Sequence, residues 1–136
     1  MNILVIRSAT RILNQTLLSL KEEFPGCRIT ILAPESTREA VEQDPLIDEV
    51  LTIIDQRRMS VSSYGKKNIA RLRERSFDLA VALYNIDHGL GYSNIDLLAC
   101  AINSKEVRGY NSKGTFVKLD SAKAIKKSFM EKTTFF

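Results

Sequence analysis

The chain opens with NILVI at residues 2–6, an apolar run with little polar interruption. A strand with one wet face alternates apolar and polar residues, whereas a continuous apolar run is typical of a strand buried on both faces. Double burial of this kind occurs in parallel sheets that carry helices on both sides. Residues 2–6 therefore predict a central strand of an α/β domain.

Helix and strand patterns alternate along the rest of the chain. Leu13, Leu17, Leu20 and Phe24 recur at helical spacing, and Pro25-Gly26 follows as a stop signal. Further strands are predicted at residues 28–33, 49–54, 78–84 and 107–110. Further helices are predicted at residues 36–44, 66–75, 93–102 and 121–132. Residues 56–65 and 85–92 are predicted loops.

This alternation predicts one doubly wound, Rossmann-like domain over residues 1–136, with a mostly parallel sheet of about five strands in the order 3-2-1-4-5. Helix caps are expected at Thr10, at Ser36 with Glu39, at Ser93 or Asn94, and at Asp120. The expected core residues are Leu4, Ile6, Leu17, Leu20, Ile31, Val50, Ile53, Val81, Leu83 and Leu98.

Composition excludes several classes of protein. The chain is 44% hydrophobic and 26% charged, and no apolar run approaches the roughly 18 residues that span a bilayer. Its start is too short and too weakly charged for a signal peptide, so we expect a cytoplasmic location, with peripheral contact at the inner membrane face as an alternative.

Cys27 and Cys100 are expected to be reduced, and with one His they do not form a zinc pattern. We expect no metal and, without a G-x-G-x-x-G motif, no dinucleotide cofactor.

Charge is divided unevenly between the two parts of the chain. Residues 1–55 carry 5 basic and 9 acidic side chains, and residues 56–136 carry 15 and 7, which gives −4 and +8 and the total of +4. The basic part favours an anionic partner such as a phosphate or a lipid headgroup. Solvated basic helix faces are the plainer interpretation. The lysines lack interleaved aromatic residues, so we expect no nucleic-acid binding.

Several segments, in order, resemble the heptosyltransferases of glycosyltransferase family 9. These are ILVIRS at residues 3–8, FP at 24–25, ITIL at 29–32, DPLIDEV at 44–50, DLAVAL at 78–83, LLA at 97–99 and VRGY at 107–110. They match the start of that family, its N-P-x-x-D-E-V and Y-D-L-V-I-D-L segments, and its L-L-A and R-I-G-F segments. The resemblance covers roughly residues 1–115 and implies the N-terminal, acceptor-side half of a GT-B fold.

The chain departs from that family in two respects. The family places an R-x-S-S-L-G-D loop after its first strand, and the Asp acts as base on the acceptor hydroxyl. Here residues 7–11 run directly into Ile12-Leu13, and the Gly-Asp pair is missing. The family's C-terminal half, which holds the ADP-heptose donor, has no counterpart in this sequence. The resemblance thus implies a glycosyltransferase-like domain without transferase activity of its own.

Candidate site residues lie after the first and fourth strands, because ligands of doubly wound sheets bind at the carboxyl ends of strands where the strand order reverses. Asp87 and His88 are the candidates for a base, although a solvated role is the plainer interpretation. Ligand-binding candidates are Arg7, Ser8, Thr10, Arg11, Asn85 and His88.

Three hypotheses follow for the function. The first is a domain that binds an anionic sugar, a nucleotide or a lipid headgroup, alone or beside a separate donor-domain chain. The second is a non-catalytic module that docks on a protein or a membrane surface. The third is a remnant or fragment of a longer glycosyltransferase.

Overall fold

The computed structural model describes residues 1–54, 59–85 and 92–134. Among these residues, one sheet has the strand order β3-β2-β1-β4-β5-β6. The strands are β1 (Asn2–Ile6), β2 (Arg28–Pro34), β3 (Glu49–Ile53), β4 (Leu79–Leu83), β5 (Glu106–Tyr110) and β6 (Phe116–Leu119). β1 to β5 run parallel to one another, and β6 is antiparallel to β5. The predicted doubly wound sheet and its order 3-2-1-4-5 are confirmed, and β6 adds one edge strand.

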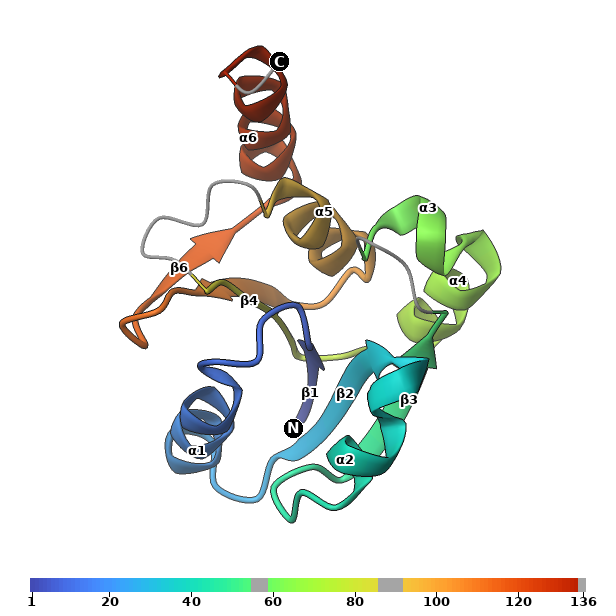
Figure 1. Ribbon diagram of the computed structural model, residues 1–136, viewed down its shortest axis with the longest axis vertical. Coiled ribbons are helices and arrows are strands. Elements are labelled where there is room, and N and C mark those ends of the chain that lie inside the picture. The colour runs from blue at the N-terminus through green and yellow to red at the C-terminus, as the bar shows by residue number, and fades with distance from the viewer. Residues whose placement is uncertain (55–58, 86–91, 135–136) are drawn as a thin grey trace.

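Helices cover both faces of the sheet (Figure 1). One face carries α1 (Leu13–Glu23), the single 3-10 turn η1 (Glu35–Thr37) and α2 (Arg38–Glu42). The other face carries α3 (Val61–Tyr64), α4 (Lys66–Glu74) and α5 (Ser93–Ala101). α6 (Ser121–Thr134) packs on α5 and projects from the body of the molecule (Figure 1). None of the helices in the described ranges is long and apolar enough to cross a membrane.

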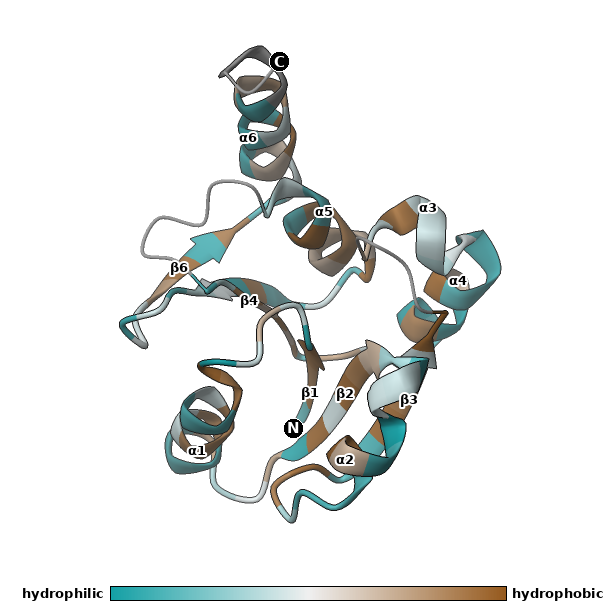
Figure 2. Ribbon diagram, viewed as in Figure 1, coloured by the Kyte–Doolittle hydropathy of each residue, from teal (hydrophilic) through white to brown (hydrophobic). Residues whose placement is uncertain are grey.

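The core is arranged around β1, which is hydrophobic along most of its length (Figure 2). Leu4 and Ile6 pack toward α4 and α5, whereas Ile3 and Val5 pack toward α1. All four side chains are fully buried, as expected for a strand with helices on both sides. The other predicted core residues are also buried, except Val50, which is half-buried because β3 lies at the edge of the sheet.

Several predicted helix starts differ from the structure. α1 has Ile12 as its N-cap and α5 has Tyr92, neither with a side-chain capping bond, so the predicted caps at Thr10 and at Ser93 or Asn94 are wrong. α2 begins at Arg38 instead of after Ser36. Asp120 does cap α6, since its carboxylate accepts a bond of 2.8 Å from the Lys123 N–H.

A capping box occurs in the segment that was predicted to be a loop. The Ser60 hydroxyl accepts from the Ser63 N–H at 3.1 Å, and the Ser63 hydroxyl accepts from the Ser60 N–H at 2.8 Å. These reciprocal bonds satisfy two backbone donors and start the one-turn helix α3. The Ser-rich composition that indicated a loop here is what caps the helix.

Strand β6 follows β5 through a tight turn. The Asn111 side-chain oxygen accepts from the N–H groups of Lys113 (3.0 Å) and Thr115 (3.2 Å), and Gly114 adopts a left-handed φ of 81°. Three of the four side chains of β6 are exposed, so the strand lacks the apolar pattern of a buried one. This exposure is why β6 was absent from the sequence-based prediction.

Arg108 of β5 ties the end of α1 to the sheet. It is only 5% exposed, and its guanidinium makes two bonds of 2.8 Å to the carboxylate of Glu23, with a further bond to Glu106. The same group lies 4.0 Å from the ring centroid of Phe116. A buried guanidinium needs such partners, because an unpaired charge in the interior is costly.

A second buried polar cluster ties α6 to the sheet. The Asp96 carboxylate of α5 is fully buried, and it accepts a bond from the Tyr84 hydroxyl and one of 2.5 Å from the Lys127 ammonium. The ammonium also lies 4.6 Å from the centroid of the Tyr84 ring. Below that ring, Gly109 leaves room for the hydroxyl, since a Cβ at this position would lie 2.2 Å from it. The cluster therefore joins β4, α5, β5 and α6.

The first prediction concerns Glu23→Gln. Hydrogen bonding to Arg108 lowers the pKa of Glu23 below its ordinary value of 4.5, so this carboxylate stabilises the fold above about pH 4.5 and loses that effect as the pH falls further. At pH 7 the free energy of unfolding of the variant should be about 1–2 kcal/mol lower, because the buried Arg108 loses a partner but keeps Glu106. Urea titrations should show a smaller difference in the free energy of unfolding between the original chain and the variant at pH 3 than at pH 7. Glu22→Gln, an exposed neighbour, is the control and should change stability by less than about 0.5 kcal/mol.

The second prediction concerns Gly109→Ala. The added methyl group would overlap the Tyr84 ring, which Asp96 and Lys127 hold in place, so unfolding should require about 1–3 kcal/mol less free energy. In a Tyr84→Ala background the same change should cost close to nothing, because the overlapping ring is gone. Thermal melts of the four proteins of this double-mutant cycle provide the measurement. An equal loss of stability in both backgrounds would show that the added methyl group does not act through the Tyr84 ring.

Candidate functional site

The segment after β1 is held to the sheet by Ser8. Its hydroxyl donates to the Leu83 carbonyl at 2.8 Å and accepts from the Leu83 N–H at 3.1 Å. These bonds continue the pairing of β1 with β4 beyond the last paired residues, Val5 and Val81. The Ser8 hydroxyl therefore joins β1 to β4, where the strand order reverses. The sequence had predicted that Ser8 contacts a ligand at this place.

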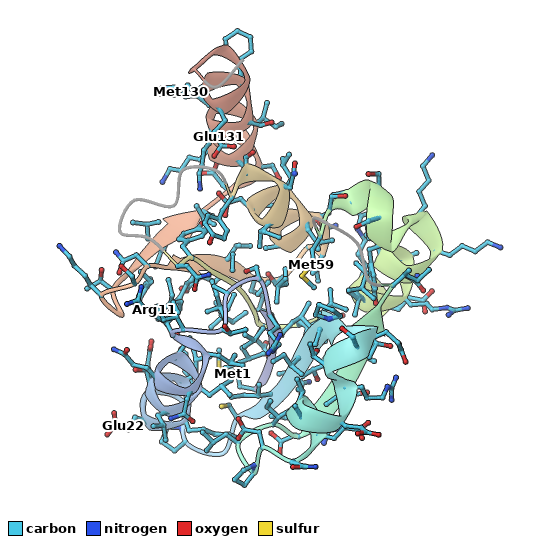
Figure 3. All side chains as sticks on the ribbon, in the orientation of Figure 1. Met1, Arg11, Glu22, Met59, Met130 and Glu131 are labelled. Carbon is cyan, nitrogen blue, oxygen red and sulfur yellow. The ribbon has the colours of Figure 1, made fainter. Side chains whose placement is uncertain are left out.

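The rest of the segment after β1 contains both buried and exposed side chains. Ala9 and Ile12 are buried in the core, which leaves Thr10 and Arg11 exposed between them; Arg11 is labelled in Figure 3 near the start of α1. The Arg7 side chain is half-buried, and its Nε is a buried donor without a hydrogen-bond partner among the described residues. At the carboxyl end of β1, Arg7 thus has a buried donor without a partner among the described residues.

The segment after β4 contributes Tyr84 and Asn85. The Tyr84 N–H continues the β4–β5 pairing with a bond of 2.8 Å to the Tyr110 carbonyl. Asn85 is exposed, and its N–H donates to the Tyr92 hydroxyl at 3.2 Å. Asp87 and His88, the two candidates for a base, lie outside the described residues. Their roles stay predictions.

In the described part of the β4–α5 region, residues 79–85 and 92–101, the carboxylate is that of Asp96. Burial raises its pKa, although the bonds from Lys127 and Tyr84 act in the opposite direction. Burial likewise raises the pKa of Tyr84. Perturbed pKa values often mark functional sites, but Asp96 is fully buried and both its oxygens are bonded. We therefore assign this cluster to the anchoring of α6.

A groove of about 530 Å³ lies between the start of α3, the start of α4 and the start of α5. It is lined by Ser60, Val61, Ser62, Gly65, Lys66, Asn94 and Leu97. The helices that follow parallel strands begin at the carboxyl edge of the sheet, so the groove belongs to the region where doubly wound folds bind ligands. Lys66 is exposed, and the first N–H groups of α4 and α5 lack partners within their own helices.

This groove can accept a negative group. An ammonium, hydroxyl groups, an amide and helix N-termini are donors that suit a phosphate or a carboxylate. Sequence reasoning placed the site at residues 7–11 and 85–88 and omitted the groove residues. The signal that could have located them is the serine cluster at residues 60–63, followed by Gly65 and Lys66.

Nothing in the described residues indicates a metal centre. They contain no group of three or more His, Cys, Asp or Glu side chains placed to hold an ion. Cys27 is a buried free thiol. Cys100 is a half-buried free thiol, and burial raises its pKa to about 11, so it is protonated at neutral pH.

Solved structures with the same architecture include two glycosyltransferases. Neither a protein-family model nor a curated protein sequence matches the chain. The structure of E. coli ADP-heptose LPS heptosyltransferase II is similar with a TM-score of 0.58 and 20% sequence identity, over 83% of this chain. The glycosyl transferase family 9 structure from Veillonella parvula DSM 2008 is similar with a TM-score of 0.53 and 20% identity, over 81% of this chain.

In both cases the match covers 31% of the longer protein. At this level of identity the likeness shows the fold alone. The chain therefore has the α/β fold of one part of these glycosyltransferases, as the sequence resemblance implied, and its sheet is consistent with half of a GT-B fold.

Proposed function

We propose that this chain is a glycosyltransferase-like binding domain that takes an anionic sugar, a nucleotide or a phosphate-bearing lipid headgroup at the carboxyl edge of its sheet. The observation that carries the proposal is the groove between α3, α4 and α5, with the Lys66 ammonium, the Ser60 and Ser62 hydroxyls and the Asn94 amide around it.

Two features favour an anionic ligand over a neutral one. The nine-residue helices α4 and α5 begin at the groove, and the partial positive charge at helix N-termini attracts anions. Among the described residues, the lining contains Lys66 and no carboxylate. Arg7 and Arg11, at the end of β1, add positive charge to the same edge of the sheet. A phosphate or carboxylate on the ligand would gain most from this arrangement.

We further propose that the isolated chain does not transfer a sugar. Inverting transfer needs a base within hydrogen-bond reach of the acceptor hydroxyl and cationic groups at the leaving diphosphate. Residues 7–12 include no carboxylate, and the Asp96 carboxylate is buried and bonded to Lys127 and Tyr84. The chain also spans only 31% of the heptosyltransferase II it resembles, which leaves most of that protein without a counterpart here.

The third prediction is an NMR titration at low salt with a sugar phosphate, ADP and a neutral sugar. Amide shifts should occur at residues 60–66 and 93–97 and near Arg7, and they should be larger for the two phosphate-bearing ligands. Lys66→Gln should weaken binding about threefold, because an exposed ionic contact contributes up to ~1 kcal/mol. Binding should also weaken as salt rises, since the charges are exposed to screening.

Two variants distinguish binding in the groove from binding at the end of β1. Lys67→Gln removes the same charge from the next residue of α4, which does not line the groove, and should bind as the original chain does. Arg7→Ala/Arg11→Ala tests the end of β1 independently. Shifts confined to residues 113–132 and unchanged in every variant would refute the proposed site and leave a diffuse basic surface.

The fourth prediction is a transfer assay with ADP-heptose and a lipopolysaccharide core acceptor. The purified chain should form no product above the buffer blank. His88→Ala is the decisive comparison, because His88 is a candidate base. Turnover by the original chain that disappears in this variant would show that the domain is an enzyme and that His88 acts on the acceptor.

A further inference from the structure

α6 packs on the molecule in the opposite sense to an ordinary surface helix. A helix at a protein surface usually turns its apolar side chains to the core and its charged side chains to water. On α6 the side toward α5 contains the fully buried Ala124 and Lys127, whose ammonium bonds to the buried Asp96. Ile125 and Phe129 are instead 60% and 68% exposed. Large apolar side chains therefore lie on the side of α6 that faces away from α5.

The bond between Lys127 and Asp96 keeps α6 in this orientation. Rotation of the helix about its axis, to bury Ile125 and Phe129, would withdraw the ammonium from a carboxylate that has no exposed surface. An unpaired charge at that depth is costly, so the exposure of the two apolar side chains is built into the fold. Exposed apolar side chains that lie together mark surfaces that contact another molecule or a membrane.

Basic side chains accompany the apolar ones. Lys123, Lys126 and Met130 follow each other at the three- and four-residue spacing of one helix face, and all three are exposed. The two lysines make no ion pair with a described residue. Glu131, the acidic residue of α6, lies two helical turns from the buried Ala124 and therefore on the side toward α5. The outer face of α6 thus consists of Lys123, Ile125, Lys126, Phe129 and Met130.

The charge of the outer face disfavours a second copy of the chain as its partner. A symmetric dimer brings the same patch of both subunits together, so Lys123 and Lys126 of one subunit would meet those of the other. Like charges across an interface are unfavourable, and the described residues of the outer face include no carboxylate to offset them. A partner that matches this face is both anionic and apolar.

A bilayer with anionic lipids has both properties, since its phosphate groups lie directly above hydrocarbon. Helices that combine lysines with large apolar side chains lie in the plane of such a surface, with the apolar side chains below the headgroups. Lysine stems follow the apolar surface while their ammonium groups reach the phosphates. α6 projects from the body of the molecule (Figure 1) and has hydrophobic and hydrophilic residues along its length (Figure 2), so a flat surface can meet it side-on.

From these observations we infer that the outer face of α6 binds the surface of an anionic lipid bilayer. Ile125, Phe129 and Met130 enter the headgroup region, and Lys123 and Lys126 contact the lipid phosphates. This surface is separate from the groove between α3, α4 and α5, whose lining includes no residue of α6. The inference does not rest on the function proposed for that groove.

The fifth prediction uses Phe129→Trp as a fluorescent probe, because the chain contains no tryptophan. The exposed indole should emit as in water in the free protein. Its emission should move to shorter wavelength when vesicles of equal parts phosphatidylglycerol and phosphatidylcholine are added at low salt. Pure phosphatidylcholine vesicles should produce a much smaller shift, and added salt should weaken binding to the anionic vesicles. Unchanged emission with an excess of anionic vesicles would overturn the inference.

Matched variants test the apolar and the basic residues separately, by co-sedimentation with the same vesicles. Ile125→Ser/Phe129→Ser should bind at least about tenfold more weakly, because burial of these side chains drives insertion. Both positions are exposed, so thermal melting should be unchanged. Leu18→Ser, at a 50% exposed position of α1, should bind as the original chain does. Lys126→Gln should weaken binding about fivefold, whereas Lys67→Gln, on α4, should have no effect.

Each alternative partner gives a distinct result. Vesicle binding that persists in Ile125→Ser/Phe129→Ser would place the lipid contact elsewhere and refute this inference, while it would leave the proposed function of the groove intact. A dimer in sedimentation velocity that the same variant dissociates would assign the face to a second copy. An equal shift of the Phe129→Trp emission with soluble polyglutamate would assign it to an acidic protein. Equal binding to neutral vesicles would also refute the inference.

Failure of the proposed function has a different signature. Loss of the ligand-induced amide shifts at residues 60–66, with vesicle binding through α6 unchanged, would refute the function of the groove and leave the lipid contact standing.

Discussion

Burial of β1 on both faces is the constraint on which the rest of the structure depends. Its side chains from Ile3 to Ile6 are fully buried, two toward each layer of helices. A strand that is apolar on both sides cannot lie at an edge, so β2 and β4 must flank it. With β2 on one side and β4 on the other, the order of strands reverses at β1, and the loops that leave β1 and β4 meet at the same edge of the sheet.

Away from that centre, polar contacts replace apolar packing. α6 turns Lys127 toward the fully buried Asp96, while Ile125 and Phe129 on the same helix are 60% and 68% exposed. Arg108 performs a similar role between α1 and β5. Buried pairs of this kind contribute little net stability compared with apolar residues, but removing one partner is costly. They fix where the helices lie more than they strengthen the fold.

The described part of the molecule presents grooves of different character. The groove at the carboxyl edge combines Lys66 with helix N-termini and hydroxyl groups, which suits a compact anionic group. A groove along the edge strand β3 is lined by Arg38, Arg71 and Arg75, of which Arg38 pairs with Glu35 and Glu42 and Arg75 pairs with Glu49. The described lining of the first groove comes from residues after residue 56, whereas the second groove also includes residues of α2 and β3.

The sequence by itself determined the layout of the fold, because local apolar patterns report burial directly. Residues 2–6 predicted a central strand, and the spacing from Leu13 to Phe24 predicted α1. It did not reveal β6, whose side chains are mostly exposed, or the start of α3, whose serines resemble a loop. The candidate residues Arg7, Ser8 and Asn85 do lie at the expected edge. Only the tertiary structure decided that the Ser8 hydroxyl joins β1 to β4 and that Ser60, Lys66 and Asn94 line one groove. These contacts join residues far apart in the chain, so no local pattern records them.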